Sequence, residues 1–393
     1  MSFPDRVPVP EEVLEIARVL EGAGYEAWCV GGALRDTLLG DPHSDFDLAT
    51  SAPPEEVQRL FRRTAAIGVK HGTVGVIDRK RVMHEVTTFR RDVETDGRHA
   101  VVEYGASLDE DLARRDFTIN AIAYHPLRAE WRDPHGGQQD LDAGVVRAVG
   151  DPAARFREDY LRILRAIRFA ARFAFTIDPA TWRAARDAAP GLGRLSAERV
   201  RDEWFKGLRT ARELETLVRL WHESGAAAVW LPDLRPAGAA PPAAISPPPR
   251  DSILLTALLS SDPVGLLRRL RGSNAEIARA AAIAAGPAEP GGTGEVAVRR
   301  WLAVVGDAAD DLAALSRLRS GEEPAWLATV RAVRDRGDPV TRGDLAVTGR
   351  DLEELGLSGK QIGETLASLL DRVLEDPSAN TRERLLALAR GGR

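Results

Sequence analysis

The residue composition of this sequence changes abruptly near Pro152, and that change limits the folds that the chain can adopt. Before it, short runs rich in Val, Ile and Thr have the length and composition of β-strands. After it, stretches rich in Ala, Leu and Arg are typical of helices. The strand-like runs lie at 26–30, 46–50, 73–79 and 81–89. We therefore predict an α+β protein, in which a mixed sheet is followed by an all-helical remainder.

Two helices are also expected among the strands, and proline marks a later boundary. Residues 11–24 have the apolar spacing of an amphipathic helix, and residues 31–40 form a helix-like run with Gly at both ends. The segment 232–251 contains seven prolines, which is typical of a loop or linker. The predicted domains are a head at 1–150, a helical neck at 151–232, and a helical body and tail at 233–393.

Composition restricts the cellular setting and the partners. The only cysteine, Cys29, excludes an intramolecular disulfide. No run approaches the roughly 18 consecutive apolar residues of a membrane span, and the N-terminus lacks the pattern of a secretory signal. We therefore expect a cytoplasmic protein with no membrane partner, and the oligomeric state stays open.

The net charge of −5 hides a local basic excess. Residues 147–223 contain 16 Lys and Arg against 11 Asp and Glu. A basic helical segment in an acidic protein is compatible with binding to nucleic acid, although a solvated helical surface has the same composition.

The run SDFDLAT places two carboxylates one residue apart. In a strand, Asp45 and Asp47 point to one side while Phe46 points into the core. Two close carboxylates repel each other unless a cation lies between them, and Mg²⁺ prefers such oxygen ligands. Asp45 and Asp47 are therefore predicted as catalytic metal ligands. The alternative is a solvated turn, because the preceding residues are turn formers.

Two further features could join this site. Gly31 and Gly32 precede a helix, so the backbone there can approach a phosphate closely, and Arg35 can add a charged contact to a triphosphate. Glu85, in the strand-like run MHEVTT, is either a third metal ligand or an ordinary salt-bridged residue of the sheet.

Taken in order, the motifs resemble a known family. GGALRD and SDFDLAT look like the first motif of the polymerase-beta-type nucleotidyltransferases. RRDFTINAIA, DPHGGQQDL and REDYLRILRAIRFAARF follow at 114–123, 133–141 and 157–173. This set resembles the bacterial class II tRNA nucleotidyltransferases, which add CCA, and the related poly(A) polymerases. The resemblance implies a polymerase-beta-type head with a five-stranded sheet, then a helical neck, body and tail.

The helix expected at 157–173 can select a base. Asp159 and Arg162 are three residues apart and share a helix face, which Arg165 and Arg168 continue. Cytosine and adenine both present an amino donor beside a ring-nitrogen acceptor, which an Asp and an Arg can match. Uracil and guanine present the opposite pattern. We predict that these four residues bind the nucleotide; the alternative for Asp159 and Arg162 is a surface ion pair.

The resemblance also implies a mechanism and partners. Two Mg²⁺ ions held by Asp45 and Asp47 would activate the 3′-hydroxyl of tRNA, with CTP and ATP as the other substrates. Arg115 would contact the nucleotide, and the neck and body would bind the acceptor stem. CC-adding, A-adding and poly(A) activities remain alternatives, as does a non-catalytic RNA-binding module.

Overall fold

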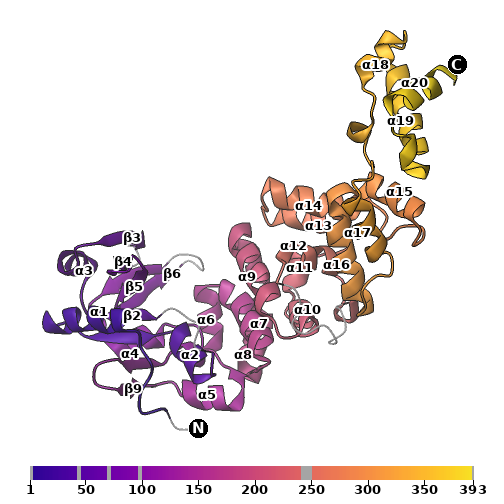
Figure 1. Cartoon of the computed structure of the whole chain (residues 1–393). Coiled ribbons are helices and arrows are strands. Elements are labelled where there is room, and N and C mark those ends of the chain that lie inside the picture. The colour runs from indigo at the N-terminus through magenta and orange to yellow at the C-terminus, as the bar shows by residue number, and fades with distance from the viewer. Residues whose placement is uncertain (1–2, 42–45, 69–71, 96–99, 240–249, 392–393) are drawn as a thin grey trace. The chain divides into compact units, whose positions relative to one another are not determined.

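The computed structural model describes residues 3–41, 46–68, 72–95, 100–239 and 250–391. The chain forms two compact units, Met1–Pro232 and Asp233–Arg393 (Figure 1). Within the described ranges, no helix combines the length and the apolar character needed to cross a membrane.

The first unit contains a mixed sheet of seven strands in the order β3-β4-β5-β2-β1-β8-β9. Strand β2 runs parallel to β5, and the other neighbours are antiparallel. The strands are β1 (Ala27–Val30), β2 (Asp47–Thr50), β3 (Thr64–Gly68), β4 (Thr73–Ile77), β5 (Met83–Thr88), β8 (Ala123–His125) and β9 (Glu130–Arg132). The expected number of five strands was wrong, since short strands such as β8 and β9 extend the edge beside β1.

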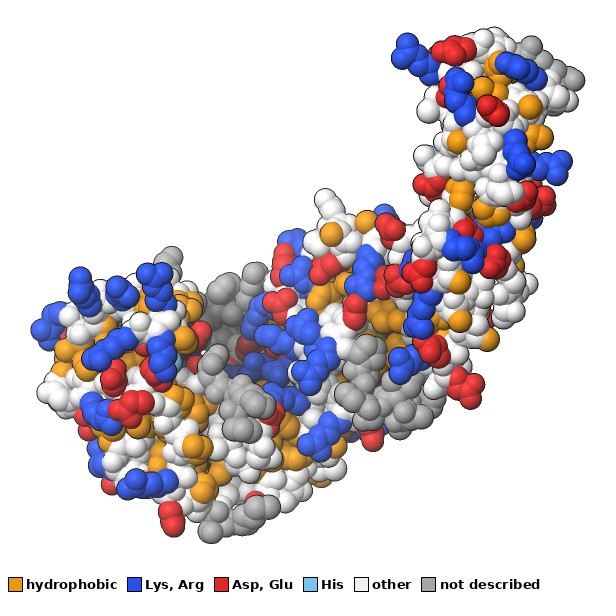
Figure 2. Space-filling view, viewed as in Figure 1, with side chains coloured by type: hydrophobic (Ala, Val, Ile, Leu, Met, Phe, Trp, Pro, Cys, Tyr) orange, Lys and Arg blue, Asp and Glu red, His pale blue; other side chains and the backbone are white. Residues whose placement is uncertain are grey.

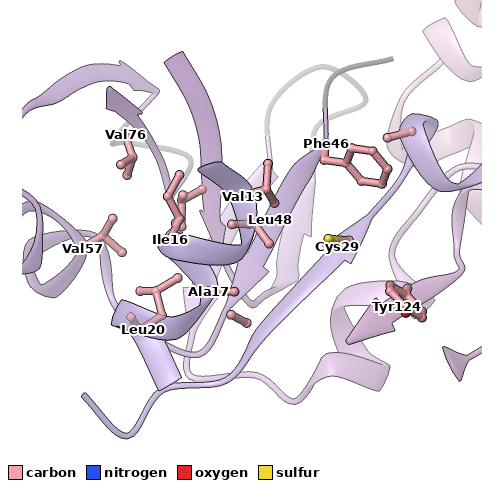
Figure 3. Close-up of a cluster of buried hydrophobic side chains, with 14 of the residues drawn as sticks. Val13, Ile16, Ala17, Leu20, Cys29, Phe46, Leu48, Val57, Val76 and Tyr124 are labelled. Carbon is pink, nitrogen blue, oxygen red and sulfur yellow. The ribbon is translucent and has the colours of Figure 1, made fainter. Parts of the chain in front are cut away.

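Two helices cover one face of this sheet. The amphipathic helix α1 (Glu11–Gly22) buries Val13, Ile16 and Leu20 against the strands, and α3 (Pro54–Leu60) contributes Val57 (Figure 3). Phe46 is 7% exposed in the same core, which confirms its predicted inward direction. Because this core covers the face of β2 toward which Phe46 points, Asp47 lies on the opposite face, which is available for a functional site.

The opposite face is covered by fewer elements. Trp28 and Val30 of β1 pack with Leu108 and Leu112 of α4 (Leu108–Ala113). Helix α2 (Gly32–Leu38) begins directly after β1, and a separate hairpin, β6 (Arg90–Thr95) with β7 (Ala100–Tyr104), lies in its own sheet.

Helices follow the head, as predicted. They are α6 (Pro152–Glu158), α7 (Leu161–Phe173), α8 (Pro179–Ala188), α9 (Ala197–Thr210), α10 (Leu214–Glu223) and α11 (Ala226–Trp230), and the short helix α5 (Gly137–Ala143) precedes them at the end of the head. One small pair of strands interrupts them, because β10 (Val145–Val146) pairs in parallel with β11 (Thr176–Ile177).

The expected continuous helix at 157–173 is wrong. Asp159 is extended, with φ −153° and ψ 106°, and separates α6 from α7. Its carboxylate accepts a hydrogen bond from the backbone N–H of Leu161 at 3.0 Å, in the manner of a side chain that caps a helix. Asp159 and Arg162 therefore do not share a face of one helix.

The second unit consists of helices and the loops that connect them, with no strand among its described residues. Its α-helices are α12 (Ser252–Leu259), α13 (Pro263–Arg269), α14 (Asn274–Ala285), α15 (Glu295–Val305), α16 (Ala309–Ser320), α17 (Leu327–Asp335), α18 (Gly349–Glu354), α19 (Lys360–Glu375) and α20 (Arg382–Gly391). The last three share a small apolar core around Leu352, Val373 and Leu385.

Candidate active site

A cavity of about 600 Å³ opens between the sheet of the head and helix α7. Every described residue that the sequence nominates for the site lines it. These residues are Gly32, Arg35, Asp47, Glu85, Arg115, Asp159, Arg162, Arg165 and Arg168. Asp45 lies outside the described residues.

Two carboxylates form the acidic side of the cavity. Asp47 begins β2, Glu85 lies on β5, and the parallel register pairs the next residues, Leu48 and Val86. Asp47 and Glu85 are therefore neighbours on the same face of the sheet. Among the residues that the structure describes, no three His, Cys, Asp or Glu side chains gather as a metal site.

The turn between β1 and α2 requires glycine at one position. Gly31 has φ +79°, and a Cβ there would lie 3.3 Å from Nη1 of Arg115. The absence of a side chain at Gly31 thus lets the Arg115 guanidinium approach the backbone of the turn at the wall of the cavity.

One buried carboxylate holds two arginines at this wall. Asp111 of α4 accepts hydrogen bonds from Arg114 Nη2 at 2.8 Å and from Arg115 Nη2 at 3.1 Å. Burial alone would raise the pKa of Asp111, but the charges of Arg115 and Arg114 outweigh it and lower that pKa. Asp111 therefore stays ionised and fixes the direction of Arg115. The Nε of Arg115 is buried without a hydrogen-bond partner among the described residues.

A second buried carboxylate connects the head to α7. Asp116 accepts hydrogen bonds from Arg165 Nε at 2.7 Å and from Asn120 Nδ2 at 2.9 Å. Burial would raise the pKa of Asp116, but the charge of Arg165 and the hydrogen bond from Asn120 outweigh it and lower the pKa to about 2. Arg165 is thus held by a charge from the head while its side chain lines the cavity.

Arg35 is the most enclosed of the predicted cationic residues. It is 4% exposed, and it donates to Asp36 Oδ1 at 2.9 Å and to Asn120 Oδ1 at 2.5 Å. Its guanidinium lies 4.9 Å from the ring centres of Phe169 and Phe173 on α7. Burial lowers the pKa of Arg35. These contacts engage Arg35 inside the protein, and its contact with a triphosphate stays a prediction.

The two residues predicted to select the base meet the cavity from a helix junction. Asp159 accepts a hydrogen bond from Arg199 of α9 at 2.7 Å. Arg162 donates to Glu158 Oε2 at 2.6 Å and to the backbone carbonyl of Arg114 at 3.0 Å. Asp159 and Arg162 thus have separate partners, and the alternative of an ion pair between them does not apply.

Arg168 completes the basic side. It donates to Glu203 of α9 at 2.6 Å, and its guanidinium lies 4.2 Å from the ring centre of Phe169. Burial lowers the pKa of Arg168.

The sequence analysis did not identify two carboxylates that hold site residues, those of Asp111 and Glu203. The i, i+4 spacing of Asp111 and Arg115 on one helical run was a usable signal, whereas nothing local pairs Arg168 with Glu203.

Comparison with known proteins matches the same two parts of the chain. Residues 27–147 match the model of the poly A polymerase head domain. Residues 174–237 match a model described as a probable RNA and SrmB-binding site of polymerase A.

Relatives with assigned names agree with these models. The chain is 45% identical over 219 residues to the CCA-adding enzyme of Leuconostoc mesenteroides, covering 54% of each chain. It is 47% identical over 193 residues to that of Lactiplantibacillus plantarum, covering 49% of this chain and 47% of the relative. The chain thus spans about half the length of the curated relatives it matches.

One solved structure extends the likeness to nearly the whole chain. The crystal structure of the Bacillus stearothermophilus CCA-adding enzyme in complex with CTP is 34% identical, with a TM-score of 0.80. The match covers 97% of this chain and 96% of that one. With the ordered motifs and the cavity that gathers them, this similarity shows that the chain belongs to the tRNA nucleotidyltransferase and poly(A) polymerase family.

Proposed function

We propose that this protein adds C and A to the 3′ end of tRNA from CTP and ATP, without a nucleic-acid template. The observation that carries the proposal is that a single cavity contains Asp47, Arg115 and the pair Asp159 and Arg162. The residues proposed for phosphoryl transfer and those proposed for base selection can therefore contact the same bound nucleotide. The crystal structure with 34% identity, a CCA-adding enzyme in complex with CTP, supports the same assignment.

Base selection would rest on Asp159 and Arg162. The Asp159 carboxylate accepts from the exocyclic amino group of C or A, and Arg162 donates to the adjacent ring nitrogen. With U or G, a carbonyl would face Asp159 and an N–H would face Arg162. Each mismatch leaves a charged group unpaired, at a cost of roughly 1–3 kcal/mol. The partners Arg199 and Glu158 hold both side chains before a nucleotide arrives.

The acidic side suits a divalent metal such as Mg²⁺. Asp47 and Glu85 are adjacent oxygen donors on one face of the sheet, at the same cavity as several arginines. Asp45 and Asp47 would hold the metal, with Glu85 as a possible third donor. When bound, Mg²⁺ would neutralise phosphate charge and favour ionisation of the RNA 3′-hydroxyl.

The basic side would position the triphosphate. Arg115, directed by Asp111, faces the Gly31–Gly32 turn, where the backbone can approach phosphate oxygens. Arg35, Arg165 and Arg168 add positive charge around the cavity. Phosphoryl transfer needs positioning and charge neutralisation more than covalent catalysis, and this wall provides both.

The remaining regions would bind the RNA. We assign the head to 1–150, the nucleotide-selecting neck to 151–232, and an RNA-binding body and tail to 233–393. The match of 174–237 to an RNA-binding model supports a contact in the neck. A-form RNA is recognised by its shape and phosphates, so the acceptor stem can be held without reading its sequence. We place this activity in the cytoplasm.

The experiment uses tRNA that lacks its 3′ CCA and each labelled nucleoside triphosphate in turn, with Mg²⁺ present. Two additions from CTP followed by one from ATP support the proposal. Addition of C alone, of A only after CC, or of long A tracts would assign CC-adding, A-adding or poly(A) activity. A protein that binds tRNA and adds nothing would be a non-catalytic RNA-binding module.

A further inference from the structure

The head carries an apolar surface beside the cavity that the proposed function does not yet use. Side chains alternate along β5, so Met83, Glu85 and Thr87 point to the same face of the sheet. Glu85 and Thr87 line the cavity, whereas Met83 lies outside it and is 47% exposed. Met83 therefore lies on the same face of the sheet as the cavity residues, next to the cavity and exposed to solvent.

A glycine on the next strand completes this surface. Gly75 of β4 pairs with Glu85 in the register of β4 and β5. A Cβ at Gly75 would lie 2.5 Å from Cδ1 of Ile67 and 2.8 Å from Sδ of Met83. Both side chains thus lie over the bare backbone of Gly75, and Ile67 is 46% exposed. We call Ile67, Gly75 and Met83 the apolar ledge.

The order of the strands shows where the ledge lies relative to the proposed triphosphate and metal sites. From one side of the sheet to the other, the Gly31–Gly32 turn follows β1, Asp47 is on β2, Glu85 is on β5, and the ledge spans β5, β4 and β3. In phosphoryl transfer the attacking and leaving oxygens are roughly in line. With the triphosphate at the Gly31–Gly32 turn, the attacking RNA end must approach from beyond Glu85, where the ledge lies.

Basic residues gather at one end of the ledge strands. Arg62 and Arg63 directly precede β3, and Arg79, Lys80 and Arg81 form the turn between β4 and β5. The register of β3 with β4, in which Thr64 pairs with Val76, places both groups at the same end of the sheet. All five are exposed, and Figure 2 shows Lys and Arg side chains over this part of the head. Arg79 and Lys80 pair with Glu15 and Glu12 of α1, on the opposite face of the sheet, so Arg62, Arg63 and Arg81 form the basic rim of the ledge. Such a rim suits RNA phosphates.

We propose that the apolar ledge holds the 3′-terminal unpaired nucleotide of the RNA substrate, while Arg62, Arg63 and Arg81 contact the preceding phosphates. This inference rests on the proposed function. The terminal base changes after each addition, so its binding surface must accept different bases. Apolar contact with the face of a base meets that need because it reads no hydrogen-bonding edge. Met83 adds a flexible side chain that adapts to bases of different size.

The first test combines Ile67→Ser with Met83→Ser and uses Val19→Ser as the matched control. Val19 is 40% exposed on α1, which packs on the opposite face of the sheet. The double variant should lower kcat/KM for RNA about tenfold, by loss of contact with one base. Its affinity for CTP without RNA should equal that of the wild type, and the control should behave as the wild type. Unchanged kcat/KM in the double variant would overturn the proposal.

The second test uses the unaltered protein. A tRNA that ends in 4-thiouridine in place of its terminal nucleotide is irradiated with the full chain, and the crosslinked peptide is identified. A crosslink to the peptides that contain Ile67 or Met83 is expected, and a crosslink confined to the neck helices would refute the ledge. If the wild type adds no nucleotide at all, the proposed function fails, whereas an active wild type without this crosslink refutes only the ledge.

Discussion

The Asp159 carboxylate accepts a hydrogen bond from Arg199 at 2.7 Å, although 40 residues separate them in the sequence. Asp159 is extended between α6 and α7, and its other carboxylate oxygen accepts from the backbone N–H of Leu161 at the start of α7. Helix α9 therefore positions a residue that we assign to base selection.

Arg199→Ala should loosen this position. We expect kcat/KM for CTP and ATP to fall about tenfold, the loss of one charged hydrogen bond, with weaker discrimination against UTP and GTP. Single-nucleotide addition with all four triphosphates measures both effects. Arg212→Ala, an exposed position just after α9, is the control and should change neither. Full discrimination in Arg199→Ala would mean that Asp159 needs no support from α9.

Arg162→Ala removes the proposed donor to the ring nitrogen. The rates with CTP and ATP should both fall by one to two decades, equivalent to about 1.5–3 kcal/mol, and selectivity should shrink because nothing then opposes a ring N–H. Thermal melting recorded alongside separates this effect from instability. Arg219→Ala removes an exposed ion pair with Glu223 on α10 and serves as the comparison. A lower melting temperature with unchanged nucleotide preference would assign Arg162 a purely structural role.

Asp45→Ala and Asp47→Ala should each abolish the addition of both C and A, because both reactions would use one metal site. Binding of tRNA, measured by gel shift, should persist since the acceptor stem is held elsewhere. Asp307→Ala, at an exposed position of the second unit, should leave both additions intact. Substantial addition of either nucleotide by the Asp47 variant would argue against a shared site.

The lowered pKa of Asp116 predicts that the free energy of unfolding depends on pH. Its pKa of about 2 lies below the ordinary 3.8, so the carboxylate contributes stability above about pH 4 that is lost as the pH falls toward 2. Asp116→Asn should lower the free energy of unfolding at pH 7 by about 2 kcal/mol and flatten its change between about pH 4 and 2. Denaturant titrations at several pH values measure this. Asp335→Asn, exposed at the end of α17, should keep the wild-type profile.

Salt tests the basic neck. If residues 147–223 neutralise RNA phosphates, tRNA affinity should fall steeply between low and physiological salt, with a linear dependence of log K on log salt. Fluorescence titration at four salt concentrations gives the slope. A flat dependence would mean that the local excess of basic residues is only a solvated helical surface.

The sequence predicted the elements of the head well because their signals are local. The apolar spacing of residues 11–24 predicted α1, and the alternation around Phe46 predicted which way its ring points. Strands β8 and β9 contain three residues each, too few for a pattern to be recognised, so the sheet was expected to be smaller.

The site was predicted more successfully than its geometry. Asp159 and Arg162 line the cavity, but the residues of 157–173 are all compatible with one helix. The break appears only in the structure, where Asp159 is extended and its carboxylate accepts from the backbone N–H of Leu161 and from Arg199. The burial of Arg35 likewise depends on Phe169 and Phe173, more than 130 residues away in the sequence. Such tertiary contacts leave no periodic signal in the chain.

The contact of Arg35 with the rings of Phe169 and Phe173 has a consequence for protein engineering. Helix α2, which follows the glycine turn of the head, is bound to α7 through Arg35 and through the ion pair of Asp36 with Arg172, and α7 carries the arginine that we propose for base selection. A graft of α7 alone onto another nucleotidyltransferase would omit the side chains of α2 and α9 that hold α7 in its position beside the cavity. The smallest transplantable selector therefore comprises the glycine turn, α2, α7 and α9 together, an assembly that is continuous in space and interrupted in sequence.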